Sequence, residues 1–265
     1  MNPNLNSLWS ADTPFGEVDL SWQGDFQLML RFPEQIDQRL SNVLLGIESA
    51  LEQCHSIEET AMGYCTLAIH LAVDLEIDLE IKDLATMEIA LGELIGLIDN
   101  SLSKSLRDWD LDGQRQGSRT LRLPVCYGGD YGPDIESVAD FTGLSVDEVI
   151  ARHASGRYYV YMLGFSPGFP YMGGMDLSLK TPRLKVPRLQ IAAGSVGIAD
   201  NQTGIYPQQT PGGWQIIGRC PLPLFDTNRE NPATINAGIY VEFVPIEASF
   251  YEELVANGGI TWDLQ

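Results

Sequence analysis

The stretch QIAAGSVGIADNQTGIYPQQTPGGWQIIGR, residues 190–219, decides the fold class of the second half of the chain. Short apolar runs alternate in it with Gly, Pro, Asn and Gln, as is typical of short strands joined by turns. Two further runs of this kind flank it, RYYVYML at 157–163 and GIYVEFVPI at 238–246. Together these short strands predict an all-β barrel or a sandwich.

Two short helices are predicted just before these strands. A strand, TLRLPVCYGG at 120–129, ends in Gly-Gly. Pro133 then stands where a first helical residue would, and Gly143 is placed to close that helix. Ser145 and Glu148 have the spacing of a capping box, which predicts the start of a second helix.

The first half of the chain alternates strands and helices with almost no Pro or Gly. Strands are predicted at 24–32 and 65–73, and helices with apolar residues at helical spacing at 36–53 and 84–104. This pattern predicts a small α/β sandwich. The charged, aperiodic run at 107–119 is the predicted linker.

We therefore predict an α+β protein with its domains in the order small α/β, then β-barrel. The predicted boundaries are 1–110 for the small α/β N-terminal domain and 118–250 for the barrel domain, with a C-terminal tail at 251–265.

The charge of the chain narrows the class of partner. Its 265 residues carry a formal net charge of −20, which repels phosphate backbones and argues against general nucleic-acid binding. Residues 151–226 nevertheless hold seven Lys and Arg against three Asp. Such a segment is compatible with an anionic small substrate, and a surface of mixed charge explains it equally well.

Other sequence features favour a cytoplasmic protein. There is no run of about 18 apolar residues that would cross a membrane, and the first residues lack the pattern of a signal peptide. The four cysteines are scattered, and with three histidines they show no metal-ligand spacing, so we predict no metal site. Neither a phosphate loop nor a dinucleotide-binding motif occurs.

Residues 164–168 read GFSPG, which matches the G-x-S-x-G pattern of a serine-hydrolase nucleophile elbow. That elbow needs a backbone N–H from the residue after the serine, and here that residue is Pro167, which has none. The next residues, GFPYMGG, also make a poor helix. Ser166 is therefore not predicted to be a nucleophile, and the Gly, Pro and aromatic residues indicate a stiff loop, suited to binding or to an ordinary strand crossover.

Six short patterns stand in order between Gly164 and Pro221: G-F-x-P-G-F, P-R-x-x-x-P-R, A-G-S-V-G-I-A, Q-T-G-I-Y-P, P-G-G-W and G-R-x-P. Together they resemble the family that contains the B subunits of 5-oxoprolinase, the sporulation kinase inhibitor KipI and allophanate hydrolase subunit 1. The resemblance is close from about Leu121 to Ile246 and looser before that. It implies a small α/β domain followed by a cyclophilin-like β-barrel.

The same resemblance implies a function. The B subunits of 5-oxoprolinase act with a C subunit (allophanate hydrolase subunit 2-like) and with a separate A subunit to hydrolyse 5-oxoproline to glutamate with ATP. ATP is thus an implied cofactor whose site is not visible in the sequence, and we expect the chain to be inactive without its partners. Two alternatives remain open: a KipI-like inhibitor of a histidine kinase, or the carboxyl-acceptor component of a biotin-dependent carboxylase acting on urea or a similar amide.

Individual side chains are candidates for the site. His153 lies on the apolar face of its helix and is either a core histidine or an acid–base group, and the resemblance retains it as the catalytic candidate. Arg183 and Arg188 each follow a proline; their guanidinium groups suit a carboxylate or phosphate, or a salt bridge within the domain. Further candidates for contact with the substrate or nucleotide are Lys185, Ser195, Gln202 and Tyr206. Aromatic residues expected at an interface are Phe165, Phe169 and Trp214.

Overall fold

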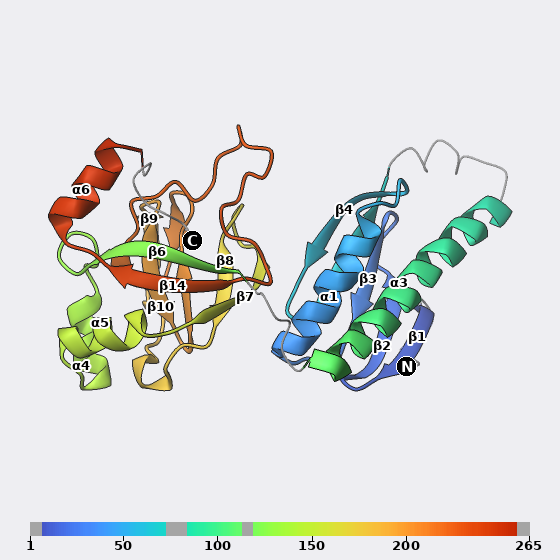
Figure 1. The fold of residues 1–265 in the computed structure, drawn as a ribbon, viewed down its shortest axis with the longest axis horizontal. Helices are drawn as coiled ribbons and strands as arrows, with labels where there is room; N and C mark the ends of the chain where they lie inside the picture. The colour runs from blue at the N-terminus through green and yellow to red at the C-terminus, as the bar shows by residue number, and fades with distance from the viewer. Residues whose placement is uncertain (1–6, 73–83, 113–118, 259–265) are drawn as a thin grey trace. The chain divides into compact units, whose positions relative to one another are not determined.

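The structure is a computed structural model that describes residues 7–72, 84–112 and 119–258. The chain divides into two compact units, residues 1–116 and residues 117–265. Each unit, drawn as a ribbon in Figure 1, has its own set of buried apolar side chains as a hydrophobic core.

The first unit is a five-stranded sheet covered by two helices. Its strand order is β1-β2-β3-β5-β4, and every neighbouring pair is antiparallel. Both helices pack on one face of the sheet and against each other (Figure 1). The elements are β1 (Ser7–Thr13), β2 (Gly16–Trp22), β3 (Gln27–Arg31), α1 (Gln38–Leu51), β4 (Ile57–Met62), β5 (Thr66–Leu71) and α3 (Leu84–Asp112).

Helix α1 follows its sequence pattern closely. The Asp37 side chain caps it by accepting the backbone N–H of Arg39 at 2.7 Å. The predicted apolar face is buried, namely Leu40, Val43, Leu44, Ile47 and Leu51. Helix α3 instead continues beyond the predicted end at residue 104, because no Pro or Gly interrupts the chain before Gly113. The predicted linker at 107–119 therefore begins inside a helix, and its part at 113–118 lies outside the described residues.

The second unit is built on a closed barrel with strand order β10-β11-β8-β7-β14-β6-β13. Strands β6 and β14 pair in parallel, and the other neighbouring pairs of the barrel are antiparallel. The predicted α+β class is thus confirmed, with a barrel rather than a sandwich. The barrel strands are β6 (Thr120–Tyr127), β7 (Tyr158–Leu163), β8 (Pro170–Gly173), β10 (Ser195–Ala199), β11 (Gln202–Ile205), β13 (Gln215–Arg219) and β14 (Tyr240–Pro245).

Two helices lie between β6 and β7, as the sequence predicts: α4 (Ile135–Thr142) and α5 (Val146–Ala154). The capping box is present. The Ser145 hydroxyl accepts the Glu148 N–H at 3.2 Å, and the Glu148 carboxylate accepts the Ser145 N–H at 2.9 Å.

A further helix, α6 (Ala248–Ala256), occupies part of the predicted C-terminal tail. Tyr251 and Leu254 are buried on its inner face, so this segment packs on the barrel unit rather than leaving it. The predicted tail from residue 251 therefore begins within a helix, which apolar residues at i and i+3 stabilise.

Smaller elements complete the second unit. A short 3₁₀ helix, η1 (Leu177–Leu179), follows β8, and β9 (Arg188–Ile191) pairs with β12 (Thr210–Gly212) in a separate two-stranded ribbon. Gly194, in the A-G-S pattern, has φ +79°, and a Cβ there would lie 2.1 Å from the Cys220 carbonyl oxygen. Only glycine fits this close approach.

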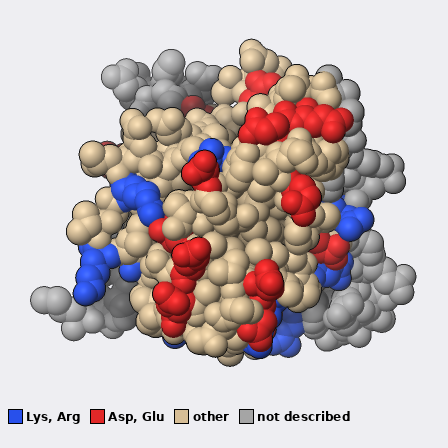
Figure 2. All heavy atoms as spheres, turned by 90° about the vertical axis from the view of Figure 1, so that its left-hand side faces the viewer, with Lys and Arg blue, Asp and Glu red and all other residues tan. Residues whose placement is uncertain are grey.

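The surface of the second unit is acidic on the side that carries α4, α5 and α6, where Figure 2 shows several clusters of carboxylates. Exposed acidic residues of these helices are Glu136, Asp140, Asp147, Glu148, Glu252 and Glu253. Within the described segments, no helix is both long and apolar enough to span a membrane.

Candidate functional site

Five aromatic rings gather on the outer face of the barrel, against the loop that the sequence singles out, because they alternate along the strands with the residues of the barrel core. The Phe169 ring is at their centre, with ring centroids of Phe165, Tyr171, Tyr206 and Trp214 at 5.5, 5.3, 5.1 and 5.5 Å. All four pairs meet edge to face, the favoured geometry for aromatic contacts. We call these five residues the aromatic cluster.

Glycines allow the rings to approach the backbone. A Cβ on Gly204, in the Q-T-G-I-Y pattern, would lie 2.9 Å from the Trp214 ring and 3.0 Å from the Phe169 ring. A Cβ on Gly212, in the P-G-G-W pattern, would lie 2.5 Å from the Tyr206 hydroxyl. Both motifs therefore serve to build the aromatic cluster.

Two adjoining cavities open beside the cluster. One, of about 90 Å³, is lined by the five rings together with Arg183, Gly212 and Gly213. The other, of about 360 Å³, follows the loop from Leu163 to Gly168, and Phe165 lines both. Phe165 is 63% exposed and has φ +65°, a strained conformation for a bulky residue of the kind that concentrates at functional sites.

Arg183 is the one cation among the residues that line the smaller cavity. Its guanidinium carbon is 6.0 Å from the Trp214 ring centroid. Its Nε is 3.7 Å from the Asp200 carboxylate, and both side chains are more than half exposed. Because such an open pair is worth little in water, the guanidinium can exchange Asp200 for an anionic ligand at small cost.

Arg188 has the opposite environment. Its guanidinium donates two hydrogen bonds to the Asp134 carboxylate, at 2.6 and 2.9 Å. The Asp134 side chain is only 9% exposed and also accepts the Ile216 N–H at 2.6 Å. The geometry therefore matches the salt-bridge alternative for Arg188, which joins the β9–β12 ribbon to the segment before α4, and speaks against its predicted contact with a ligand.

The other predicted ligand contacts are dispersed. Lys185 is exposed on the loop before β9, and Gln202 is half-buried at the turn between β10 and β11. Ser195 is buried at the start of β10, with 1% of its surface exposed. Tyr206 is buried within the aromatic cluster, and burial raises the pKa of its phenol to about 12, so it stays protonated.

Among the three predicted interface aromatics, only Phe165 lies on the surface. Phe169 and Trp214 are 1% and 6% exposed and belong to a small hydrophobic cluster that is separate from the main core of the barrel. Both rings contact each other and line the smaller cavity, so they form part of its wall.

His153 is fully buried and linked to two strands. The Thr203 hydroxyl donates to the Gly197 carbonyl at 3.0 Å, so it accepts from His153 Nε2–H at 2.8 Å. His153 Nδ1 then accepts the Tyr127 hydroxyl proton, also at 2.8 Å. This assignment gives the neutral Nε2–H tautomer.

The surroundings of this imidazole keep it uncharged. It stacks on the Phe243 ring at 4.9 Å, and burial lowers the pKa of His153 to about 3. With none of its surface exposed, the imidazole has no contact with either cavity beside the aromatic cluster. This placement matches the core-histidine alternative and speaks against the predicted catalytic role, because an imidazole enclosed away from both cavities cannot reach a substrate proton.

Ser166 is also unsuited to nucleophilic attack. Its hydroxyl oxygen is buried and lacks a hydrogen-bond partner within the described structure, so no base is positioned to activate it. The loop is closed instead by backbone bonds: Gly164 N–H donates to Phe169 C=O at 3.0 Å, and Phe169 N–H donates to Ser166 C=O at 3.0 Å. The sequence prediction that Ser166 is not a nucleophile agrees with this geometry.

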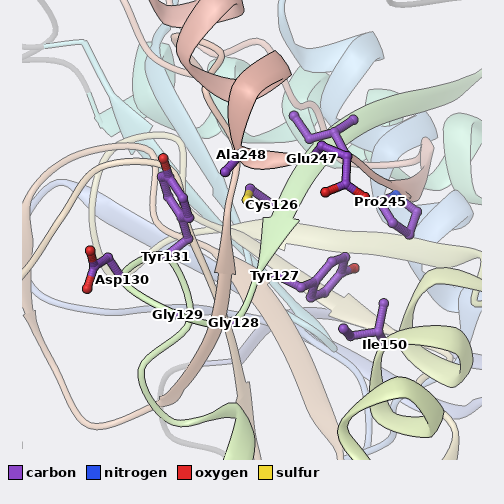
Figure 3. Close-up of a pocket in the computed structure, with 11 residues that line it drawn as sticks. Cys126, Tyr127, Gly128, Gly129, Asp130, Tyr131, Ile150, Pro245, Glu247 and Ala248 are labelled. Carbon is purple, nitrogen blue, oxygen red and sulfur yellow. The ribbon is translucent and has the colours of Figure 1, made fainter.

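Sequence reasoning missed another cavity, of about 490 Å³, at the C-terminal end of β6 (Figure 3). It is bounded by the end of β6, the Gly128–Tyr131 loop and the junction of β14 with α6. The signal that could have revealed it is the Gly128-Gly129 pair, since both glycines adopt positive φ, at 73° and 52°. They turn the chain sharply enough to leave the cavity open.

The chemistry of this β6 cavity suits an anion poorly. Figure 3 shows the Glu247 carboxylate on the same side of the cavity as Tyr127, close to Cys126. Burial and the carboxylates of Glu247 and Glu252 raise the pKa of the Cys126 thiol, which therefore stays protonated and weakly nucleophilic. The Tyr131 hydroxyl donates to Glu252 at 2.6 Å.

None of the three cavities in the described part of the chain has the cluster of cations that would hold a triphosphate. Arg183 is the one Lys or Arg among their lining residues. The lining of the β6 cavity includes the carboxylates of Asp130 and Glu247 and no Lys or Arg, which disfavours a phosphate. In the described segments, no three His, Cys, Asp or Glu side chains are grouped to hold a metal.

Comparison with known proteins identifies the family. The model of the carboxyltransferase domain, subdomain C and D, matches residues 18–235. The 5-oxoprolinase B subunit of Bacillus subtilis is 39% identical over 232 residues, covering 86% of this chain and 92% of that protein. The 5-oxoprolinase B subunit of Escherichia coli O157:H7 is 52% identical over 128 residues, covering 48% of this chain and 59% of that protein.

A solved structure supports the fold. The urea carboxylase of Kluyveromyces lactis superposes with a TM-score of 0.65 at 17% identity, covering 96% of this chain and 24% of that one. The match to the family model gives the class: this chain is of the carboxyltransferase type, subdomain C and D. The chain belongs to the family within that class that contains the B subunits of 5-oxoprolinase.

Proposed function

We propose that this chain is the B subunit of an ATP-dependent 5-oxoprolinase and that the aromatic cluster with Arg183 forms its part of the substrate site. The observation that carries the proposal is the guanidinium of Arg183 in a cavity lined mainly by aromatic rings, where it forms a solvent-open pair with Asp200. The family and its 5-oxoprolinase relatives supply the reaction.

The chemistry of the substrate fits this cavity. 5-Oxoproline is a five-membered lactam with a carboxylate, so it presents two apolar ring faces and one negative charge. The ring faces can pack against Phe165 and Trp214, and the carboxylate can take the place of Asp200 on Arg183. The phenols of Tyr171 and Tyr206 line the same cavity and can orient the lactam oxygen.

The cavity lacks the groups that would open the lactam. Hydrolysis needs a base for the attacking water and donors for the oxyanion that develops. Of the residues that line the smaller cavity, none is a carboxylate, histidine or cysteine, and Tyr206 stays protonated because of its raised pKa. We propose that the C and A subunits of the enzyme supply these groups and the ATP site, and that the chain alone is inactive.

The cytoplasm remains the proposed compartment. The four cysteines are free in the structure, which suits reducing conditions.

The test is reconstitution. The chain is mixed with the C and A subunits of its own organism, with 5-oxoproline and ATP, and the release of glutamate is measured. Glutamate is expected from the complete set and not when any one protein or ATP is left out. A complete set that releases no glutamate contradicts the proposal, and inhibition of a histidine kinase by the chain alone would then favour the KipI-like alternative.

A further inference from the structure

The two most exposed large apolar side chains in the described part of the chain lie three residues apart, beside the aromatic cluster. Leu189 is 88% exposed and Val186 is 79% exposed. Single apolar residues on a surface are ordinary, but two of them on one rigid projection next to a candidate site suggest an interaction surface. We call residues 183–189 the docking ridge.

The docking ridge is held firmly by the barrel unit. The Leu184 N–H donates to the Gly213 carbonyl at 2.7 Å, and the Gln215 side-chain amide donates to the Pro182 carbonyl at 3.0 Å. At its end, Arg188 is fixed by its two hydrogen bonds to the Asp134 carboxylate. A partner would therefore meet a preorganised surface and would lose little free energy in ordering it.

The docking ridge and its flank carry exposed positive charge in an acidic protein of net charge −20. Arg188 is neutralised by Asp134 and Arg183 pairs with Asp200, so the uncompensated cations of this segment are the exposed Lys185 on the ridge and Lys180 just before it. In a two-fold dimer the same surface meets itself, so the cations would repel each other. The charge therefore favours a different protein, with an apolar contact surface rimmed by carboxylates.

The docking ridge lies next to the smaller cavity, and Arg183 belongs to both. Gly212 and Gly213 also line the cavity. Gly212 pairs with Arg188 of the ridge, and the Gly213 carbonyl accepts the Leu184 N–H of the ridge. A protein seated on the ridge would lie over the mouth of the cavity. It would exclude water there and bring its own groups next to the substrate.

We infer that the docking ridge is the surface on which the C subunit docks, and that this contact closes the substrate cavity at Arg183. The inference rests on the proposed function for the identity of the partner. Val186 and Leu189 supply the apolar contact, Lys185 supplies charge complementarity, and Arg183 stays with the substrate. The rings of Phe169 and Trp214 are buried beneath the surface and take no part in the contact.

The experiment uses the full chain and the C subunit from the same organism. The double variant Val186→Asp/Leu189→Asp changes two exposed side chains, and Val255→Asp makes the same change on exposed α6. Binding is measured by isothermal titration calorimetry, and far-UV circular dichroism verifies the fold of each variant. The double variant is expected to weaken binding by about 100-fold or more, while Val255→Asp binds like the wild type.

A charge variant adds an independent readout. Lys185→Glu is expected to slow association and to reduce its dependence on salt, whereas Lys104→Glu, exposed on α3, leaves both unchanged. Wild-type binding by the double variant overturns the inference, as does a wild-type chain that does not bind the C subunit or that forms a dimer through these residues. If the wild-type complex forms and the double variant does not bind, yet no glutamate is released, the docking ridge stands and the proposed function fails.

Discussion

Lowering the pH from 7 to 5 is expected to destabilise the barrel unit through His153. Its folded pKa is about 3, because burial excludes the charged form, and the ordinary value in an unfolded chain is about 6.5. Between these values only the unfolded chain binds the proton. The buried neutral His153 therefore makes its full contribution to the free energy of unfolding above pH 6.5. Below pH 6.5 this contribution falls by about 1.4 kcal/mol per pH unit, toward pH 3. At pH 5 the loss is about 2 kcal/mol.

The variant His153→Gln isolates this contribution. A glutamine amide keeps one donor for Thr203 and one acceptor for Tyr127, but it cannot take up the proton. The free energy of unfolding in urea is measured at both pH values. Unfolding is followed by hydrogen exchange of peptides from β7 and β14, so that the stability of the barrel is measured separately from that of the first unit. The difference in the free energy of unfolding between pH 7 and pH 5 should shrink by about 2 kcal/mol in His153→Gln. It should persist in His55→Gln, a change at an exposed histidine.

Two results would refute the reasoning about His153. One is a ¹⁵N NMR titration in which the imidazole takes up its proton near pH 6.5 rather than remaining the neutral Nε2–H tautomer below pH 5. The other is a loss of stability between pH 7 and pH 5 that is equally large in the wild type and in His153→Gln. Either would mean that the imidazole is not enclosed as its contacts with Tyr127 and Thr203 indicate.

Three further changes have definite expectations. Arg188→Gln leaves the buried Asp134 carboxylate without its cation and should lower the free energy of unfolding by about 2 kcal/mol in urea; no change would mean that water replaces the guanidinium. Ser166→Ala removes an unpaired buried hydroxyl, so stability should stay equal or rise by about 1 kcal/mol and glutamate release should continue; a large loss of activity would restore the nucleophile reading. Gly212→Ala places a methyl group against the Tyr206 hydroxyl and should lower the melting temperature by about 5 °C, as differential scanning calorimetry would detect.

Local sequence signals predicted the local structure well. The Ser145–Glu148 capping box forms as expected, because its two hydrogen bonds join residues only three apart. The apolar face of α1 was readable from its spacing for the same reason. Helix α6 was missed because its inner face is defined by burial against the barrel rather than by a start signal: its cap residue Glu247 makes no side-chain cap bond.

The candidate site depends on contacts that the sequence does not encode locally. Arg183 and Arg188 stand in matching Pro-Arg positions, yet only Arg188 is neutralised by a buried carboxylate, since Asp134 comes from a segment 54 residues away. His153 likewise meets Thr203 across 50 residues, and helical periodicity could place it on an apolar face but could not show that it is sealed there. The composition of the loop at 164–174 indicated a stiff loop, suited to binding or to an ordinary strand crossover, while the edge-to-face packing around Phe169 required the register of the closed barrel.

The central claim is that Arg183 holds the carboxylate of the substrate, and the KM for 5-oxoproline in the reconstituted enzyme tests it most directly. Arg183→Gln is expected to raise this KM by about 10- to 100-fold, because a charge-assisted pair is lost. Arg122→Gln removes an equally exposed cation on β6, outside the aromatic cluster, and should leave KM unchanged. An unchanged KM in Arg183→Gln, or the same increase in both variants, would contradict the account.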